Sequence, residues 1–384
     1  MHCFNYAVYC ILYQFKNQYF MKNRIYSSLL LLAIFVSFSS FTIVNPDDNT
    51  KKPVNVILLV GDGMGLSQVS YALLMANERM AFERFKTLGL SKTSSGSHKI
   101  TDSAAGATAF SCGTKTYNGA IGVDMNKLPM TTILEMAEAK GFATGLVATC
   151  AITHATPAAF ISHQPSRDMY EEIAADFLKT DIDLFIGGGY NNFAKRKDSV
   201  DLTAQLVKKD YKVIRSEEEL YMYTGTQKLA ALIAPMHMPK MQEGRGNYLA
   251  NATQLAINKL AKNKGGFFLM VEGSQIDWGG HNNDAEYIRQ ETMDFDKAIA
   301  KALDFAMKDG NTLVIVTADH ETGGFALSGN EDDKVKDAIE PKFITKNHTA
   351  TMVPVYSFGP GSADLGGIYE NTWIYQVMKK SMGL

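Results

Sequence analysis

Side chains that can bind metal ions gather just after four short apolar runs of the sequence. These side chains are Asp62, His154, Thr156, Glu272, Asp277, His281, Asp319 and His320. Burying so many acids without cations would be prohibitively costly, so bound metal ions are the economical explanation. Each residue alone has an ordinary alternative, as for Asp62 in a Gly-Asp-Gly turn, where aspartate is common. Their co-occurrence is what predicts a metal centre.

Asp277 and His281 stand four positions apart, which leaves two interpretations open. They could bind one ion, or they could form a pair on the protein surface. Gly279 and Gly280 stand between them and argue against a regular helix there. His348 precedes another apolar run and would by itself be an ordinary surface histidine. No functional role is expected for the remaining histidines, which are His2, His98, His163 and His237.

Asp102 and Ser103 begin a predicted helix of very small residues. At a helix N-terminus, the Ser103 hydroxyl could be ionised by metals, and a phosphoryl group attached to it would be favoured. The ordinary alternative is a helix N-cap, which Asp and Ser often supply. Arg167 could donate two hydrogen bonds to a phosphate. Its alternative is a solvated arginine ahead of a helix that begins at Asp168.

Short apolar runs alternate with segments of helical periodicity from Val54 onward. The predicted strands are Val54–Val60, Ala143–Thr149, Asp183–Gly187, Phe267–Val271, Thr312–Thr317 and Val353–Phe358. The predicted helices are Thr131–Lys140, Asp168–Leu178, Asn247–Lys262 and Ala285–Met307. This alternation predicts an α/β three-layer sandwich, in which helices cover both faces of a mostly parallel sheet. The carboxyl ends of such strands meet at one edge, where functional groups collect.

The composition excludes several classes of protein. The 384 residues include 38 Lys and Arg against 40 Asp and Glu, a balance unlike that of a basic nucleic-acid binder or a polyacidic disordered chain. The 4 cysteines are scattered, which argues against a disulfide scaffold and a Cys-ligated zinc site. Cys112 and Cys150 are expected to be buried thiols.

The N-terminal residues predict export. Residues 21–44 carry Lys22 and Arg24, an apolar stretch and then small residues, as in a secretory signal peptide. Residues 1–20 would precede the true start if translation begins at Met21. A membrane anchor is the alternative, but several Ser and Thr residues dilute the apolar stretch. We therefore expect a periplasmic or secreted protein, with no membrane association after the signal is cleaved.

Several of these segments, in this order, resemble the motifs of the alkaline phosphatase family. They are Asp62-Gly-Met-Gly, Thr101-Asp-Ser-Ala-Ala, Thr153-His-Ala-Thr-Pro-Ala-Ala, Arg167, the run from Glu272 to His281, Thr317-Ala-Asp-His and Asn347-His-Thr. The likeness runs from about Val54 to the last predicted strand. It implies a phosphomonoesterase with two zinc ions and one magnesium ion, usually a homodimer, with an alkaline optimum and broad specificity for the alcohol.

The resemblance also implies roles for individual residues. One zinc ion would be held by Asp277, His281 and His348. The second zinc ion, beside the nucleophile Ser103, would be held by Asp62, Asp319 and His320. The magnesium ion would be held by Asp62, Thr156 and Glu272. Arg167 would bind the phosphate, and Asp102 would hold its guanidinium. The reaction would pass through a phosphoserine.

Two positions near this site vary within the family. His154 stands where some members have Asp, and Trp278 stands where many have Lys or His. Trp278 supplies neither a positive charge nor a metal ligand, so a phosphate contact from lysine is absent here. His154 would alter the magnesium affinity or admit a transition metal at the third site.

Residues 45–384 are expected to form a single catalytic domain with insertions near 190–245 and 324–347. Three rival functions stay open. A sulfatase would need a processed Cys or Ser in a different local context, because Ala-Ala follows Ser103. A phosphodiesterase would be distinguished by measuring the hydrolysis of monoester and diester substrates by the same preparation. A non-catalytic phosphate binder would have no reason to combine a full metal set with a helix-capping serine.

Overall fold

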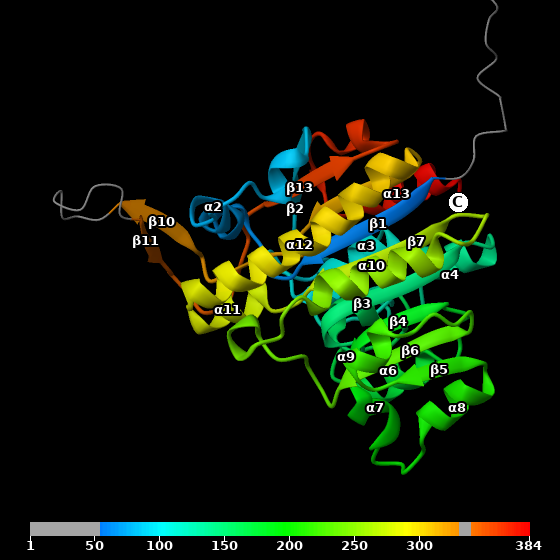
Figure 1. The fold of residues 1–384 in the computed structure, drawn as a ribbon. Coiled ribbons are helices and arrows are strands. Elements are labelled where there is room, and N and C mark those ends of the chain that lie inside the picture. The colour runs from blue at the N-terminus through cyan, green and yellow to red at the C-terminus, as the bar shows by residue number, and fades with distance from the viewer. Residues whose placement is uncertain (1–53, 330–338) are drawn as a thin grey trace, which may run out of the picture. The chain divides into compact units, whose positions relative to one another are not determined.

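A ten-stranded sheet runs through residues 54–329 and 339–384, the part of the chain that the computed structural model describes (Figure 1). Its strands are β1 (Asn55–Gly61), β2 (Thr87–Lys92), β3 (Ala143–Ala151), β4 (Leu184–Gly188), β5 (Tyr211–Ile214), β6 (Lys228–Ala234), β7 (Phe267–Gly273), β8 (Thr312–Thr317), β13 (Val353–Phe358) and β14 (Gly367–Glu370). Their order is β14-β2-β13-β8-β1-β7-β3-β4-β6-β5. Strand β13 is antiparallel to both of its neighbours, and the other neighbouring pairs are parallel. The predicted mostly parallel sheet is therefore confirmed.

Helices cover both faces of the sheet because side chains of the central strands alternate between two cores. In β1, Ile57 and Leu59 pack into one core, while Val56, Leu58 and Val60 pack into the other. The first core is closed by α2 (Leu66–Leu74), α9 (Glu217–Tyr221), α10 (Tyr248–Leu260) and α12 (Ala285–Asp309). The second is closed by α3 (Ser103–Cys112), α4 (Ile133–Ala139), α6 (Tyr170–Asp176), α7 (Tyr190–Ala194), α8 (Leu202–Lys208) and α13 (Thr372–Met382). The predicted three-layer sandwich is confirmed.

The six predicted strands all form, whereas the sequence did not reveal the strands near the two ends of the sheet. In β2 and β14 most side chains are partly or fully exposed, so no continuous apolar run marks them. Strand β5 has only four residues, and β6 is rich in alanine, a residue more typical of helices. Strands β5 and β6 both belong to segment 190–245.

Two small antiparallel ribbons lie outside the main sheet. Strand β9 (Glu321–Thr322) pairs with β12 (His348–Thr349), so His348 stands opposite Thr322. Strand β10 (Ala326–Gly329) pairs with β11 (Ile339–Lys342) inside segment 324–347. The first ribbon brings His348 to the end of β8.

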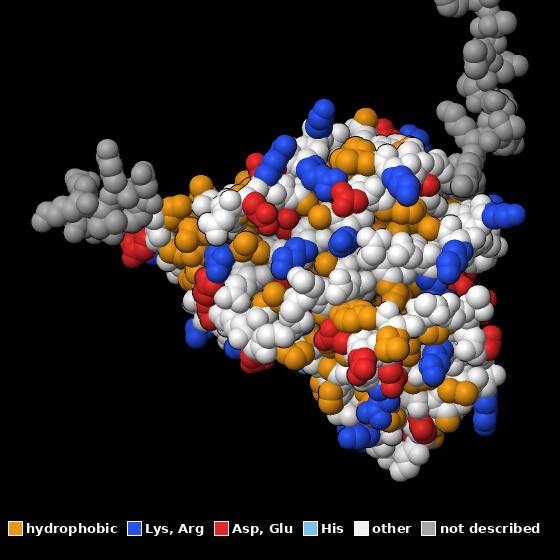
Figure 2. Space-filling model, in the orientation of Figure 1, with side chains coloured by type: hydrophobic (Ala, Val, Ile, Leu, Met, Phe, Trp, Pro, Cys, Tyr) orange, Lys and Arg blue, Asp and Glu red, His pale blue; other side chains and the backbone are white. Residues whose placement is uncertain are grey.

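The described residues, 54–329 and 339–384, belong to one compact unit. The predicted upstream residues 1–20 and signal peptide 21–44 lie outside the described residues. None of the helices described in 54–329 and 339–384 has the length and hydropathy required to cross a bilayer. On the face shown in Figure 2, basic and acidic side chains are interspersed, in keeping with 38 Lys and Arg and 40 Asp and Glu in the whole chain.

Candidate active site

The predicted metal-binding residues meet where four adjacent strands end. The order β8-β1-β7-β3 places the carboxyl ends of these strands side by side. Asp62 follows β1, Glu272 is the second-last residue of β7, and Asp319 follows β8; all three are completely buried. Burial raises the pKa of Asp62 well above its usual value, and the nearby charges of Asp319 and Asp277 add to this. Burial also raises the pKa of Glu272, to about 7.

Several carboxylate oxygens in this cluster have no hydrogen-bond partner. Both oxygens of Asp62 and Oε1 of Glu272 are buried without a hydrogen bond. An uncompensated buried carboxylate is strongly unfavourable, so these oxygens fit cations as their partners. The donors combine carboxylates with imidazoles, a mixture suited to zinc, and the oxygens beside Glu272 also suit magnesium.

Asp277, His281 and His348 form one group that could hold an ion, with donor atoms within 4.8 Å of one another. Nε2 of His281 lies 3.2 Å from Oδ2 of Asp277, and Nε2 of His348 lies 3.5 Å from Oδ1. Nδ1 of His281 lies 2.6 Å from the backbone carbonyl oxygen of Lys346, and Nδ1 of His348 lies 2.9 Å from that of Thr101. These carbonyl contacts orient both rings towards Asp277, as outer-shell partners do at metal sites.

Asp277 and His281 lie on helix α11 (Ile276–Asn282), so the expectation that Gly279 and Gly280 would prevent a regular helix was wrong. A Cβ atom on Gly279 would lie 2.8 Å from the backbone nitrogen of Ile288 in α12. A Cβ atom on Gly280 would lie 2.8 Å from the side chain of Thr322 in β9. The glycines are there because α11 packs closely against both elements, and this packing outweighs their low helix propensity.

His320 joins a second group of donors. Its Nε2 lies 3.1 Å from Oδ2 of Asp319 and 3.5 Å from Oδ1 of Asp62. Donor atoms of Asp62, Asp277 and His320 also lie within 4.8 Å of one another. Asp319 is fixed by hydrogen bonds that its Oδ1 accepts from the backbone N–H groups of Gly63 and His320.

Ser103 is the first residue of α3 and lies against the second group. Its Oγ is 3.3 Å from Nε2 of His320. Asp102 is the N-cap and accepts a hydrogen bond from the N–H of Ala105 at 3.0 Å. A Cβ atom on Gly106 would lie 3.0 Å from Cβ of Asp319, so the small residues of α3 allow the helix to approach this loop. The predicted helix start at Asp102 and Ser103 is therefore confirmed, and Ser103 lies beside the second group of donors.

Arg167 lies at the same end of the sheet rather than in solvent. Its Nη1 donates to Oδ2 of Asp102 at 3.0 Å, and its Nη2 lies 3.4 Å from Nε2 of His154. About a quarter of the side chain is exposed, 23%. The Arg167 guanidinium therefore lies against Asp102, the residue before Ser103, and its side chain is partly accessible.

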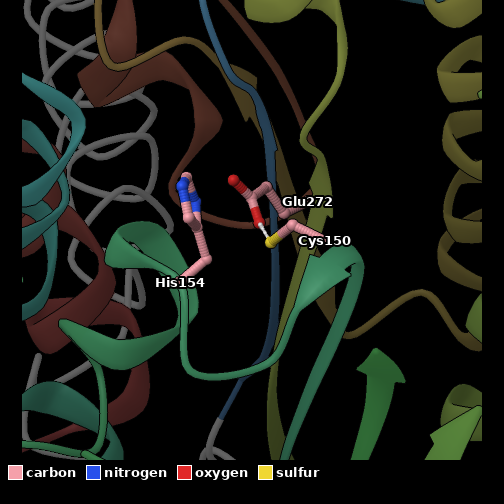
Figure 3. A group of neighbouring side chains, drawn as sticks. All are labelled: Cys150, His154 and Glu272. Atoms are coloured by element: carbon pink, nitrogen blue, oxygen red, sulfur yellow. Dashed lines mark hydrogen bonds between the residues drawn. The ribbon is translucent and has the colours of Figure 1, made fainter. Parts of the chain in front are cut away.

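A third group of donors lies at the end of β3 (Figure 3). Donor atoms of Cys150, His154 and Glu272 lie within 4.8 Å of one another. Thr156 is buried in the short helix α5 (Ala155–Ala158) that follows His154. Burial and the charge of Arg167 lower the pKa of His154 to about 3, so its ring is neutral.

Two residues near the site were missed by the sequence analysis. Cys150 was expected only as a buried thiol, but its Sγ lies 3.2 Å from Oε2 of Glu272. His237 was given no role, but its ring lies 4.8 Å from that of Trp278 and 5.8 Å from that of His154. The loop after β6 carries His237, and nothing in its local sequence indicates that this loop returns to the site. Cys150 could have been suspected, because it ends the same apolar run that leads to His154.

Comparisons with known proteins agree with this geometry. The family model for alkaline phosphatase matches residues 53–342. Alkaline phosphatase 3 of Bacillus subtilis is 41% identical over 413 aligned residues, covering 85% of this chain and 88% of the relative. The alkaline phosphatase of Escherichia coli is 32% identical, covering 88% of each protein. The solved alkaline phosphatase of the Antarctic bacterium TAB5 is 47% identical with a TM-score of 0.84, covering 87% of this chain and 99% of that structure. The chain belongs to the alkaline phosphatase family and is a metal-dependent phosphomonoester hydrolase.

Proposed function

We propose that this enzyme hydrolyses phosphate monoesters through a phosphoserine formed on Ser103. The observation that carries the proposal is the position of the Ser103 Oγ, 3.3 Å from His320, at a helix N-terminus near buried carboxylate oxygens that have no hydrogen-bond partner. A nucleophilic hydroxyl, a source of positive charge and an anion-binding helix end are the parts that phosphoryl transfer requires.

Three metal ions are part of this proposal. Asp277, His281 and His348 would hold one zinc ion; Asp62, Asp319 and His320 would hold the second. Asp62, Thr156 and Glu272 would hold one magnesium ion. Two solved mutants of the TAB5 enzyme, with a histidine replaced by aspartate or glutamate, have magnesium bound, which supports magnesium as a cofactor within this group. When bound, zinc lowers the pKa of a serine hydroxyl and of water and compensates the negative charge of the phosphoryl oxygens.

The protein side chains divide the remaining work. The Ser103 hydroxyl loses its proton to solvent as its oxygen attacks phosphorus in line with the leaving group, and the departing alkoxide takes a proton from water and leaves as the alcohol. Arg167 binds two phosphoryl oxygens, and Asp102 holds the guanidinium in the orientation that this requires. Water then cleaves the phosphoserine from the same side, releasing inorganic phosphate and restoring the hydroxyl. Two in-line displacements retain the configuration at phosphorus.

The substrate range follows from where recognition occurs. Ser103, Arg167 and the metal-binding residues all contact the phosphoryl group, so the identity of the alcohol should have little effect on the rate.

A chiral phosphate monoester tests the double displacement, because retention of configuration at phosphorus supports it and inversion contradicts it. Comparing an aryl phosphate with the matching bis-aryl phosphate separates this function from a phosphodiesterase. Metal analysis with activity before and after chelation tests the metal requirement and the proposed ratio of two zinc to one magnesium.

We also propose that the mature enzyme is a periplasmic or secreted homodimer. The signal-like residues 21–44 support export. Fractionation of cells expressing the full chain, with mass determination of the active fraction, tests both parts. Activity confined to the cytoplasm would contradict export, and a monomeric mass would contradict the dimer.

A further inference from the structure

Cys150 occupies a position unusual for a buried thiol. The side chain is completely buried. Buried cysteines usually behave as small apolar groups, yet Sγ of Cys150 lies 3.2 Å from the Glu272 carboxylate. The other described free cysteine, Cys112, contacts only the Ser111 hydroxyl and the carbonyl of Met130 within hydrogen-bonding range. Cys150 therefore faces a group that is proposed to bind metal, and Cys112 does not.

Two atoms beside the thiol are buried and have no hydrogen-bond partner. They are Oε1 of Glu272 and Nδ1 of His154. Figure 3 shows the His154 ring on one side of the Glu272 carboxylate and the sulfur of Cys150 at its other oxygen. The three side chains thus offer a sulfur, a nitrogen and an oxygen around one space. Ligand bonds to zinc are about 2.0–2.3 Å long, so donor atoms within 4.8 Å of one another need only small side-chain movements to share an ion.

We propose that Cys150 is a sulfur ligand at the third metal site, where Cys150, His154 and Glu272 together also accept a zinc or cobalt ion in competition with the magnesium ion proposed above. The inference rests on the proposed function, because it concerns the third metal site, where the oxygen donors alone would favour magnesium. Thiolate and imidazole ligands suit zinc and cobalt, whereas magnesium takes oxygen ligands and retains its waters. As the metal–sulfur bond forms, the S–H bond breaks and one proton leaves to solvent.

The competing explanation is that the Cys150 thiol only donates a hydrogen bond that orients Glu272. Serine at this position keeps a hydroxyl donor but removes the sulfur, whereas alanine removes both. A ligand role and an orienting role therefore give opposite results for Cys150→Ser. Cys112→Ser is the matched control, because it changes a buried thiol that lies away from these donors.

Cobalt titration of the chelated, metal-free full-length mature protein provides the test. We expect wild type and Cys112→Ser to develop a sulfur-to-cobalt charge-transfer absorption, and Cys150→Ser and Cys150→Ala to lack it. Cys150→Ser should also bind zinc at this site at least about 10-fold more weakly while magnesium binding is retained. Absence of the absorption in wild type, or its persistence in Cys150→Ser, would overturn the proposal.

A measurement on wild type alone keeps the test decisive if the variants fold poorly. X-ray absorption of the zinc-loaded enzyme should contain a sulfur shell at about 2.3 Å beside the nitrogen and oxygen shell. A spectrum with nitrogen and oxygen neighbours alone would overturn the assignment of Cys150. Hydrolysis of an aryl phosphate by the same sample tests the proposed function separately, since failure there concerns Ser103 and its neighbours rather than the sulfur ligand.

Discussion

Oδ2 of Asp102 accepts a hydrogen bond from Nη1 of Arg167 at 3.0 Å, while Oδ1 accepts one from the N–H of Ala105 at 3.0 Å. One carboxylate therefore fixes the first turn of α3, which carries Ser103, and also the guanidinium. The N–H of Gly119 donates to the same Oδ2 at 2.9 Å and restrains it further. The separation between the proposed nucleophile and the proposed phosphate ligand thus depends on Asp102.

Arg167→Ala should weaken the binding of substrate and of inorganic phosphate together, because one guanidinium contacts the phosphoryl group in both. We expect a loss of about 1.5–3 kcal/mol for a charge-assisted pair. The measurements are KM and the phosphate inhibition constant. Arg289→Ala is the control, since Arg289 pairs with Glu286 on the surface of α12. An unchanged phosphate inhibition constant in Arg167→Ala would show that Arg167 does not bind phosphate.

Ser103→Ala should lower kcat by several orders of magnitude while the metal content is retained, because the proposed metal ligands are other side chains. Ser111→Ala provides a matched change in the last turn of the same helix, where the hydroxyl faces the carbonyl of Thr108. Metal analysis must accompany the kinetics. Activity close to wild type in a metal-loaded Ser103→Ala protein would exclude Ser103 as the nucleophile.

Trp278→Lys should bind inorganic phosphate several-fold more tightly, because it adds a cation where the indole supplies only one N–H donor. The indole lies 6.3 Å from the His154 ring, centroid to centroid, and His154 in turn contacts Arg167. If phosphate release limits turnover, kcat should fall at neutral pH and recover as the lysine loses its proton. An unchanged phosphate inhibition constant would place the side chain away from bound phosphate.

His154→Asp should strengthen magnesium binding, because it adds an oxyanion beside Glu272 in place of a neutral imidazole. The magnesium dependence of activity, measured for both single mutants and the double mutant with Trp278→Lys, tests whether the two positions act together. If wild type and His154→Asp showed the same magnesium dependence of activity, the side chain at position 154 would not contribute to the third metal site.

The metal-free protein should lose stability as the pH rises from 6.5 to 8. A hydrogen bond to Asp277 raises the pKa of His281 to about 8, and burial raises that of Glu272 to about 7. In this interval the folded state therefore holds more protons than the unfolded state, so the free energy of unfolding falls with pH. The lowered pKa values of His154, about 3, and His348, about 4, act mainly below pH 6.5, so these two histidines offset only part of this loss near the lower end of the interval.

The expected loss is on the order of 1 kcal/mol, because His281 is partly exposed and solvent screens its interaction with Asp277. Urea unfolding at several pH values, with and without chelator, provides the measurement. Metals bind deprotonated ligands, so the gap in stability between loaded and chelated protein should widen with pH. If the chelated protein became more stable between pH 6.5 and 8, the raised pKa values of His281 and Glu272 would be contradicted.

The central strands and most of the site were predictable because their signals are local. Buried parallel strands appear as continuous apolar runs, and the acids and histidines that follow them meet at one edge. Helix α11 was not predictable, because the need for Gly279 and Gly280 comes from α12 and β9, which are distant in sequence. The contact of His237 with Trp278 likewise depends on the path of the loop after β6. Long-range packing decides such positions, and no local pattern encodes it.

Acid quenching during steady-state hydrolysis, followed by mass spectrometry of peptides, tests the central claim most directly. The account predicts phosphate on the peptide that carries Ser103 in wild type and none there in Ser103→Ala. Phosphate on another residue, or full turnover of wild type with no phosphoserine trapped at any pH, would contradict it.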